Sequence, residues 1–267
     1  MIGLAPFPLT CLLGQIATRR LRAGWDAVGD AVDALAFPRV CPICAGDADH
    51  SAFCPPCRLE LLEAAGPACP RCAMPVGPHA RLDGGCSECR GRSVGFDAAV
   101  ALGPYQGPIR SLCLQLKHER NAWLARWVAD LVAQASRPVL QAEIAAGAWV
   151  VPVPLHWTRR FARGYNQAEA LALGLARSLN LKVHEPLRRP LKTRALALAG
   201  RTERARIMRG AFTVRRPDRS RLAGRTILLV DDILTSGATA GAASRALKQA
   251  GAKRVVVVVV GRAEGKP

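Results

Sequence analysis

Eight cysteines form four Cys-x-x-Cys pairs within one short segment, and this arrangement constrains the fold more than any other feature of the chain. Two intervening residues let both sulfurs of a tight turn face one ion, so two pairs complete a tetrahedral zinc site. Residues 39–92 around the pairs are rich in proline and glycine and lack a long apolar periodicity, so they need cross-links to fold. We therefore predict a double zinc ribbon with two structural zinc ions, held by Cys41, Cys44, Cys54, Cys57, Cys69, Cys72, Cys86 and Cys89.

The spacing of the pairs leaves two ways of sharing these ligands. The gaps between pairs are 9, 11 and 13 residues, and each is long enough for a hairpin. The simplest arrangement puts one zinc on the first two pairs and one on the last two. Pairing the first with the third and the second with the fourth also fits. Iron–sulfur ligation is the competing interpretation, but four separate knuckles favour zinc ribbons.

The first residues of the chain do not have the pattern of a secretory signal. The stretch Met1–Gly14 is apolar, but no basic residues precede it, and Pro6 and Pro8 interrupt it. It is also too short to span a bilayer. Paired cysteines in a chain without such a signal favour metal binding in a reducing compartment. We therefore expect a cytoplasmic protein with no membrane span.

The chain divides into three parts by composition. Residues 1–38 are a lead-in, in which an apolar face between Trp25 and Leu35 predicts a helix. Residues 39–92 are the cysteine-rich module. Residues 93–267 alternate between apolar strands and amphipathic helices, as expected for an α/β domain.

The third part predicts a parallel sheet flanked by helices. Six consecutive valines within Arg254–Val260 indicate a strand buried on both faces, which is typical of parallel sheets. A strand, a loop, a helix and a strand follow one another over residues 226–260, which predicts a βαβ unit with a right-handed crossover. The expected strands are Phe96–Leu102, Ala148–Val153, Thr226–Val230 and Arg254–Val260, and the expected helices are Pro108–Lys117, Ala122–Ala135, Asn166–Leu179 and Thr239–Ala250.

The most informative motif follows the strand Thr226–Val230. Two aspartates stand at its carboxyl end, where open parallel sheets place their ligands. A short loop then opens a helix, whose N–H groups and hydroxyls bind phosphate, and its glycine allows close backbone approach. The acids suit sugar hydroxyls, with or without magnesium. The pattern predicts a site for a phosphorylated sugar, formed by Asp231, Asp232, Thr235, Ser236, Gly237, Ala238 and Thr239.

Two other interpretations explain the motif less well. A Walker B strand would require a GxxxxGK[ST] loop, and this sequence contains none. An ordinary strand-to-helix turn with an aspartate cap leaves the second acid and the run of hydroxyl and glycine positions unexplained.

These motifs resemble those of a known family. The segment Ile227–Thr239 (ILLVDDILTSGAT) is similar to the phosphoribosyl-diphosphate signature of type I phosphoribosyltransferases. Val151–Pro154 (VPVP) and Arg159–Gln167 (RRFARGYNQ) resemble the ComF family, phosphoribosyltransferase-like proteins associated with DNA-uptake competence. The resemblance covers roughly residues 35–262 and includes Phe37-Pro38, Tyr105–Pro108, Leu116-Lys117, Thr193 and Arg204–Phe212.

The resemblance implies a fold and a role for each matching residue. The fold would be a type I phosphoribosyltransferase-like sheet with a small N-terminal zinc-ribbon module. The catalytic acids Asp231 and Asp232 would contact the ribose 2′- and 3′-hydroxyls, and Thr235–Thr239 would hold the 5′-phosphate. Leu196 and Ile207 depart from the glutamine and asparagine that the family often carries. The residues that would face or neutralise the diphosphate are Pro154, Leu155, His156, Trp157, Arg159, Arg160 and Arg163.

The resemblance thus implies enzymatic pentosyl transfer from phosphoribosyl diphosphate with magnesium, in a role linked to DNA uptake in natural transformation. Candidates for a general base are Lys117, His118 and His156, although each is more often structural. The alternative is a non-catalytic accessory protein that binds single-stranded DNA through its zinc ribbons and a basic surface.

The charge distribution supports a polyanionic partner in either case. The net charge is +18, yet residues 1–100 carry 9 basic and 10 acidic side chains. The excess lies in the rest of the chain, and residues 182–225 alone hold 14 basic and 3 acidic side chains. Such a field attracts phosphates and nucleic acid. Because aromatic residues make up only 5% of the chain, base stacking is not expected to dominate binding.

Overall fold

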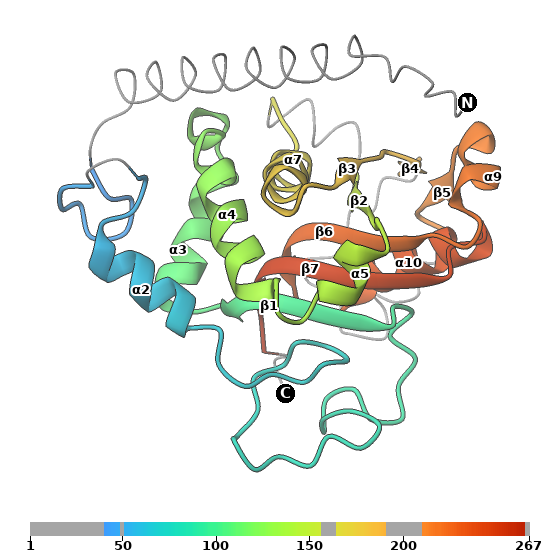
Figure 1. Cartoon of the computed structure of the whole chain (residues 1–267), viewed down its shortest axis with the longest axis horizontal. Helices are drawn as coiled ribbons and strands as arrows, with labels where there is room; N and C mark the ends of the chain where they lie inside the picture. Colours follow the sequence, from blue (N-terminus) through green and yellow to red (C-terminus); the bar gives the residue numbers. More distant parts are fainter. Residues whose placement is uncertain (1–39, 49–50, 156–163, 191–209, 265–267) are drawn as a thin grey trace, which may run out of the picture.

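The computed structural model describes residues 40–48, 51–155, 164–190 and 210–264. Its centre is a five-stranded sheet in which every neighbouring pair of strands is parallel (Figure 1). This confirms the predicted α/β class. In spatial order the strands are β1 (Ala98–Pro104), β7 (Arg254–Arg262), β6 (Thr226–Leu234), β2 (Trp149–Pro152) and β3 (Lys182–Val183).

Helices cover both faces of the sheet, and most of the predicted ones form within two residues of their expected bounds. A two-stranded antiparallel ribbon of β4 (Leu187–Arg188) and β5 (Thr213–Val214) lies beside them. The helices are α2 (Pro55–Glu63), α3 (Gly107–Gln115), α4 (Leu124–Ser136), α5 (Gln141–Ala145), α7 (Gln167–Leu179), α9 (Arg219–Leu222) and α10 (Ala238–Gln249), with short 3-10 turns η1 (Glu119–Asn121) and η2 (Arg216–Asp218).

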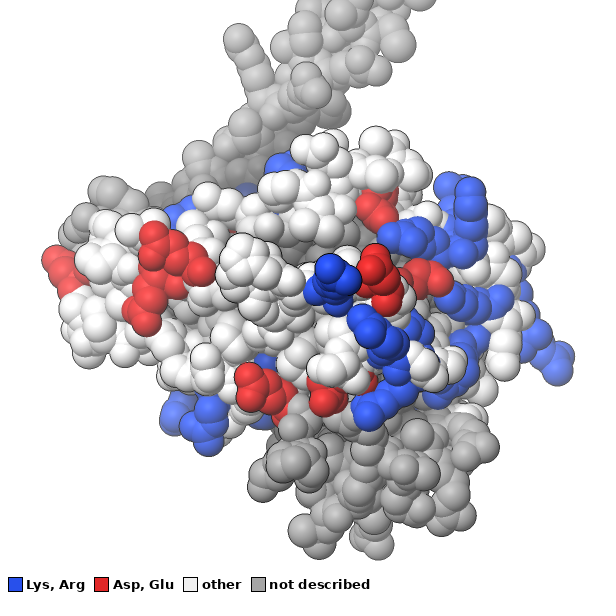
Figure 2. All heavy atoms as spheres, turned by 90° about the horizontal axis from the view of Figure 1, so that it is seen from below, with Lys and Arg blue, Asp and Glu red and all other residues white. Residues whose placement is uncertain are grey.

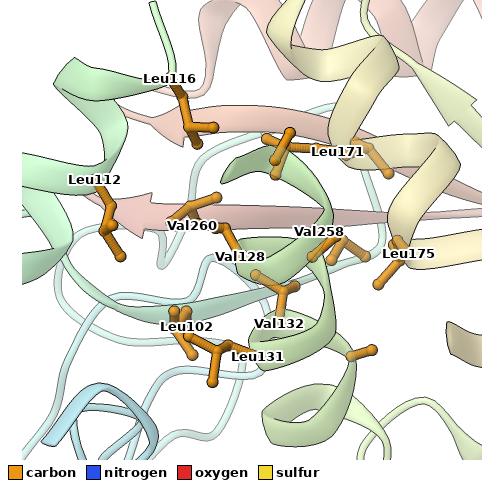
Figure 3. Packing of buried hydrophobic residues seen from close by; sticks show 14 of the residues in the cluster. Leu102, Leu112, Leu116, Val128, Leu131, Val132, Leu171, Leu175, Val258 and Val260 are labelled. Carbon is orange, nitrogen blue, oxygen red and sulfur yellow. The ribbon is translucent and has the colours of Figure 1, made fainter. Parts of the chain in front are cut away.

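The valine strand separates two hydrophobic cores. Side chains alternate across a strand, so the even-numbered valines from Val256 to Val260 pack with α3, α4 and α7. Figure 3 shows this core, with Val258 and Val260 beside the leucines of those helices. The odd-numbered valines from Val255 to Val259 pack with α10 on the other face. The prediction of a strand buried on both faces is confirmed.

Several elements differ from the sequence-based expectation, among them β6 and α2. The strand β6 continues four residues beyond Val230, because β7 also continues and pairs with it through Arg262. Asp231 and Asp232 therefore lie within the strand, near its carboxyl end. The helix α2 was not expected, since it has little amphipathic periodicity and buries only Cys57 and Leu61. It begins with a proline, which is favoured in the first turn of a helix.

The cysteine-rich segment shares the cores of the α/β domain. Cys41 and Leu61 belong to the same buried cluster as the α3 and α4 side chains. Arg58 Nη2 donates to Gln134 Oε1 at 2.8 Å, which links α2 to α4. At the free edge of the sheet, the N–H of Ala99 in β1 donates to the carbonyl of Pro70 at 3.2 Å, and Ala73 belongs to the buried cluster on the other face. The segment thus straddles the edge strand β1, and its first part lacks a core of its own.

No helix in the described part of the chain has the length and hydrophobicity needed to cross a bilayer.

Some of the sequence-based predictions concern residues that the structure does not describe. The predicted helix of the lead-in and most of the segment 191–212 are not described. The same holds for five candidate ligand-binding residues, His156, Trp157, Arg159, Arg160 and Arg163.

Candidate functional site

The eight paired cysteines form two groups of four. Within each group the sulfur atoms lie within 4.8 Å of one another, and the groups are sequential rather than interleaved. Zinc–sulfur bonds of about 2.3 Å in a tetrahedron require sulfurs about 3.8 Å apart. The observed separations fit, at 3.6 Å for Cys44–Cys54 and 3.5 Å for Cys72–Cys86. We call Cys41, Cys44, Cys54 and Cys57 the first centre, and Cys69, Cys72, Cys86 and Cys89 the second centre.

The pKa values of the cysteine thiols in both centres favour binding of a cation. Burial raises the pKa of Cys41 and Cys69, but hydrogen bonds from backbone N–H groups outweigh it and lower the pKa of each to about 7. Burial and neighbouring thiols raise the pKa of Cys57 and Cys72 above the ordinary value. Four adjacent thiols therefore resist ionising together until a cation offsets their charge. None of the nine cysteines in the described ranges forms a disulfide.

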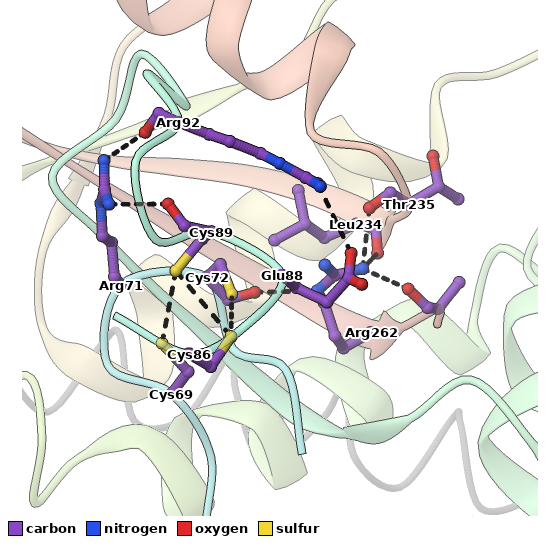
Figure 4. Close-up of polar contacts among 11 residues, drawn as sticks. Cys69, Arg71, Cys72, Cys86, Glu88, Cys89, Arg92, Leu234, Thr235 and Arg262 are labelled. Carbon is purple, nitrogen blue, oxygen red and sulfur yellow. Dashed lines mark hydrogen bonds and ion pairs between the residues drawn. The ribbon is translucent and has the colours of Figure 1, made fainter. Parts of the chain in front are cut away.

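An arginine holds together the two knuckles of the second centre. Arg71 Nη1 donates to the carbonyl of Gly84 at 3.1 Å. Figure 4 shows its other contacts, in which Nη1 donates to the carbonyl of Cys89 at 2.8 Å and Nη2 donates to the carbonyl of Arg92. A guanidinium has five fixed donors, so it can satisfy several carbonyls of one loop at once. Arg71 thereby orders the loop that carries the last cysteine pair.

The acidic pair is largely shielded from water near the carboxyl end of β6. Asp232 is 8% exposed, and its Oδ2 accepts a hydrogen bond from Gln167 Nε2 at 3.3 Å. Its backbone N–H donates to Asp231 Oδ1 at 2.9 Å. Burial, followed by the adjacent Asp232 carboxylate, raises the pKa of Asp231 well above its ordinary value. The pair therefore favours a cation or hydroxyl donors beside it.

The segment Tyr165–Gln167 supports this pair, a role that sequence reasoning did not assign. The Tyr165 hydroxyl donates to the carbonyl of Leu116. Asn166 caps α7 and donates to the carbonyl of Val153, just beyond β2, at 3.3 Å. Gln167 then reaches Asp232 from the first residue of α7. This segment joins three parts of the chain around the carboxyl edge of the sheet.

One polar atom at this site is buried without a partner. Among the described residues, nothing hydrogen-bonds to the Oε1 atom of Gln167, whose side chain is 4% exposed. A buried acceptor left unpaired costs about 1–3 kcal/mol. Sugar hydroxyls or magnesium-bound water would supply the missing donor. The oxygen atoms of Gln167, Asp231 and Asp232 thus fit a hydrated magnesium ion or a ribose.

The loop after β6 has the backbone conformation of an anion site. Gly237 adopts φ +76°, a left-handed conformation that side chains rarely allow, and it caps α10. Ser236 Oγ accepts from the N–H of Ala238 at 3.4 Å. The hydroxyls of Thr235 and Thr239 flank this turn. A helix N-terminus with added hydroxyls binds phosphate readily.

Neighbouring strands bring one predicted loop to the same edge. The strand β2 pairs with β6, and the N–H of Val153 donates to the carbonyl of Val230 at 2.9 Å. Pro154 and Leu155 follow directly and are half-buried beside the acidic pair's strand. These two of the predicted diphosphate-facing residues therefore lie at the candidate site.

A buried arginine was missed by sequence reasoning. Arg262, at the end of β7, is 5% exposed and donates to the carbonyls of Leu234, Thr235 and Ala263. It also donates to the carbonyl of Cys72 in the second centre (Figure 4). A cleft of about 440 Å³ lies between this centre and the loop after β6, with Arg245 in its lining. The available signal was an arginine that follows six valines and a glycine at the end of the strand.

A second candidate surface lies at the opposite, amino end of the strands. Figure 2 shows lysine and arginine side chains gathered at one end of the molecule. They come from the starts of β3 and β7, from the β4–β5 ribbon and from the segment before β6. We call this surface the basic end and define it by the exposed residues Lys182, Arg188, Arg215, Arg216, Arg219, Arg221, Arg225, Lys253 and Arg254.

Fold and site together define a class: a phosphoribosyltransferase-type α/β domain joined to two four-cysteine zinc-ribbon centres. Comparison with known families agrees, since residues 32–90 match the double zinc ribbon domain and residues 179–266 match the phosphoribosyl transferase domain. These two domains are the ones that the ComF resemblance implies, and the curated relatives that match most of this chain include proteins named for competence or DNA utilization.

Three relatives illustrate how similar this chain is to known proteins and how much of each protein is matched. Competence protein F of Haemophilus influenzae is 27% identical, over 74% of this chain and 85% of that protein. The DNA utilization protein YhgH of Escherichia coli is 29% identical, over 71% of this chain and 81% of that protein. YhgH of Salmonella typhi is 28% identical, over 84% of this chain and 96% of that protein.

Proposed function

We propose that this protein binds phosphoribosyl diphosphate together with magnesium at the carboxyl edge of its sheet, in a cytoplasmic role linked to DNA uptake. The observation that carries the proposal is the shielded acidic pair beside the unpartnered Gln167 Oε1, one short loop from the start of α10. The names of the relatives support the link to DNA. The free thiols of the two centres support a reducing compartment.

Each part of the site would take one part of this ligand. Asp231 and Asp232 would accept hydrogen bonds from the ribose hydroxyls, and the loop Thr235–Thr239 would donate to the 5′-phosphate. Pro154 and Leu155 would face the diphosphate, and the family resemblance adds Arg159, Arg160 and Arg163 as neutralising charges. Magnesium would offset the charge of the departing diphosphate, so pentosyl transfer is the reaction that this arrangement allows.

Titration calorimetry tests the proposal directly. Wild-type protein is expected to bind phosphoribosyl diphosphate in the presence of magnesium and much more weakly after magnesium is removed. Ribose 5-phosphate should bind less tightly, because it lacks the diphosphate that magnesium bridges. Absence of binding to phosphoribosyl diphosphate with magnesium, in protein that retains both zinc ions, would refute the proposal.

Replacing Thr239 with valine is expected to weaken binding severalfold. The substitution removes one hydroxyl donor from the first turn of α10 and keeps the shape of the side chain. A hydrogen bond to a charged group contributes about 1.5–3 kcal/mol. The other donors of the loop would still bind the phosphate and compensate for part of this energy, so the expected loss of affinity is severalfold. Thr239→Ser should bind like wild type, and Thr213→Val, at the exposed first residue of β5, is the matched control. Equal affinities for all variants would remove Thr239 from the site.

A second candidate function, binding of single-stranded DNA, is favoured by the basic end. We infer that this surface, rather than the acidic edge, would contact the nucleic acid. Acidic side chains nearby are few, with Asp218 paired to Arg221 at 3.8 Å and Glu143 paired to Arg254 at 3.0 Å. The exposed arginines would contact phosphates, which makes binding sensitive to salt and nearly independent of sequence.

Reversing two of these charges tests this function. The double variant Arg216→Glu with Arg219→Glu should bind single-stranded DNA more weakly at low salt. The slope of log affinity against log salt should fall by about 1.4, since each lost contact on a single strand accounts for about 0.7. Reversal of two exposed arginines outside both the basic end and the zinc ribbons, Arg110 and Arg120, is the control. If the two double variants behave alike, the basic end is not the binding surface.

A further inference from the structure

A single side chain connects the second centre to the candidate phosphate loop. Arg262 Nε donates to the carbonyl of Cys72 at 2.8 Å. Its Nη1 donates to the carbonyls of Leu234 at 2.9 Å and Thr235 at 2.7 Å. The two loop carbonyls stand at the point where β6 ends and the loop begins. The direction in which the chain leaves the sheet is therefore set by a guanidinium that also binds the second centre.

The carbonyl of Cys72 is presented by a turn that depends on its metal. The N–H of Ala73 donates to the carbonyl of Cys69 at 2.8 Å, and Ala73 adopts φ +55°, which is unfavourable for a residue with a side chain. Four thiolates on one ion hold such a knuckle closed, and small zinc modules open when the ion is removed. The acceptor for Arg262 Nε would then move.

A second contact joins the same two parts. The segment that leaves the second centre lies against α10 so closely that a Cβ on Gly241 would be 2.3 Å from the carbonyl oxygen of Val94. A Cβ on Gly95 would likewise be 2.6 Å from the carbonyl oxygen of Gly241. The glycines thus allow the backbone of this segment to touch the second turn of α10. The first centre, by contrast, packs with α3 and α4 on the other face of the sheet.

We propose that Arg262 is a positioning residue through which the zinc-bound second centre holds the phosphate-binding loop in its binding conformation. Loss of zinc from the second centre would release the loop, whereas loss from the first centre would not act by this route. The inference rests on the proposed function for the loop's ligand, but the coupling itself is a property of the unliganded protein. The second zinc ribbon is then part of the binding site rather than a separate module.

The test compares three variants of the full-length protein. Arg262→Met removes the donors and keeps an unbranched side chain, Cys86→Ser removes a ligand of the second centre, and Cys44→Ser removes a ligand of the first. Zinc content, hydrogen–deuterium exchange of the amides from Thr235 to Gly241 and affinity for phosphoribosyl diphosphate with magnesium are measured for each. Arg262→Lys, which retains a buried cationic donor, serves as the conservative variant.

We expect Arg262→Met to keep two zinc ions yet exchange the loop amides at least tenfold faster and bind ligand at least tenfold more weakly. Cys86→Ser should lose one zinc and show the same loop exchange, while Cys44→Ser should lose one zinc and leave the loop close to wild type. Arg262→Lys should restore part of the protection.

Two results would overturn the inference. One is unchanged loop exchange in both Arg262→Met and Cys86→Ser. The other is equally fast exchange in Cys44→Ser, which would indicate general loosening of the fold. Because exchange is measured without ligand, a wild type that fails to bind phosphoribosyl diphosphate refutes the proposed function and leaves the test of the coupling intact.

Discussion

Replacing Asp231 and Asp232 together with asparagine is expected to lower the affinity for phosphoribosyl diphosphate with magnesium at least tenfold. Both carboxylates would accept hydrogen bonds from the ribose, and each charged hydrogen bond is worth roughly 1.5–3 kcal/mol. A loss of about 1.4 kcal/mol already corresponds to a factor of ten. Calorimetric titration of wild type and variant measures the change.

The folded structure should survive this double substitution. Asparagine keeps an oxygen that can accept from Gln167 Nε2 and from the N–H of Asp232. Because burial raises the pKa of Asp231 in the folded state, its ionisation at neutral pH disfavours folding, and asparagine removes this cost. The resulting gain in stability should disappear in acid, where the carboxyl is protonated in both folded and unfolded chains.

The matched control changes the same charge at exposed positions. Glu60→Gln with Glu63→Gln removes two carboxylates from the surface of α2, far along the chain from the candidate site. This control should bind the ligand like wild type. If the Asp231 and Asp232 variant also binds like wild type, the loop after β6 is a structural turn and the proposed function is wrong.

Chelation of both zinc ions is expected to loosen α3 and α4 of the α/β domain as well as the cysteine-rich segment, whereas loss of the first ion alone should leave the loop after β6 in place. Metal analysis should find about two zinc ions per chain. Sequence composition predicts that a chelator unfolds only residues 39–92, because the α/β domain has its own core. The structure changes this expectation, since Cys41 and Leu61 lie in one buried cluster with side chains of α3 and α4. Structural zinc contributes on the order of 10 kcal/mol in small modules, comparable with the whole stability of a domain.

The reactivity of the Cys113 thiol distinguishes opening of the α/β domain from unfolding of residues 39–92 alone. Cys113 lies on α3 and is fully buried in the same cluster as Cys41 of the first centre. Its sulfur lies 3.8 Å from the carbonyl oxygen of Asp232. After chelation, a thiol reagent with peptide mapping should label Cys113 at least tenfold faster than in the zinc-loaded protein. Labelling of the eight paired cysteines without faster labelling of Cys113 would instead support an independently unfolding ribbon. An iron–sulfur absorption band, or less than one zinc per chain, would contradict the zinc assignment itself.

Local patterns in the sequence were sufficient for the elements and for most of the candidate site. Apolar runs and helical periodicity depend on neighbouring residues, so they predicted β2, β7, α4, α7 and α10 closely. The Cys-x-x-Cys spacing predicted the metal ligands because a knuckle is itself a local structure. The acidic pair and the hydroxyl loop were found for the same reason, since all their residues fall between Asp231 and Thr239.

The sequence by itself therefore determined that this chain would form a parallel α/β sheet, hold two metal ions and place acids beside a helix N-terminus. Only the tertiary structure decided which cysteine pairs share an ion, that the first centre shares the core of the α/β domain, and that Arg262 links Cys72 to Thr235. These contacts join residues distant in the chain, Cys72 and Arg262 being 190 positions apart. No local periodicity encodes such pairings, because they arise from how the strands are ordered and the segments packed across β1.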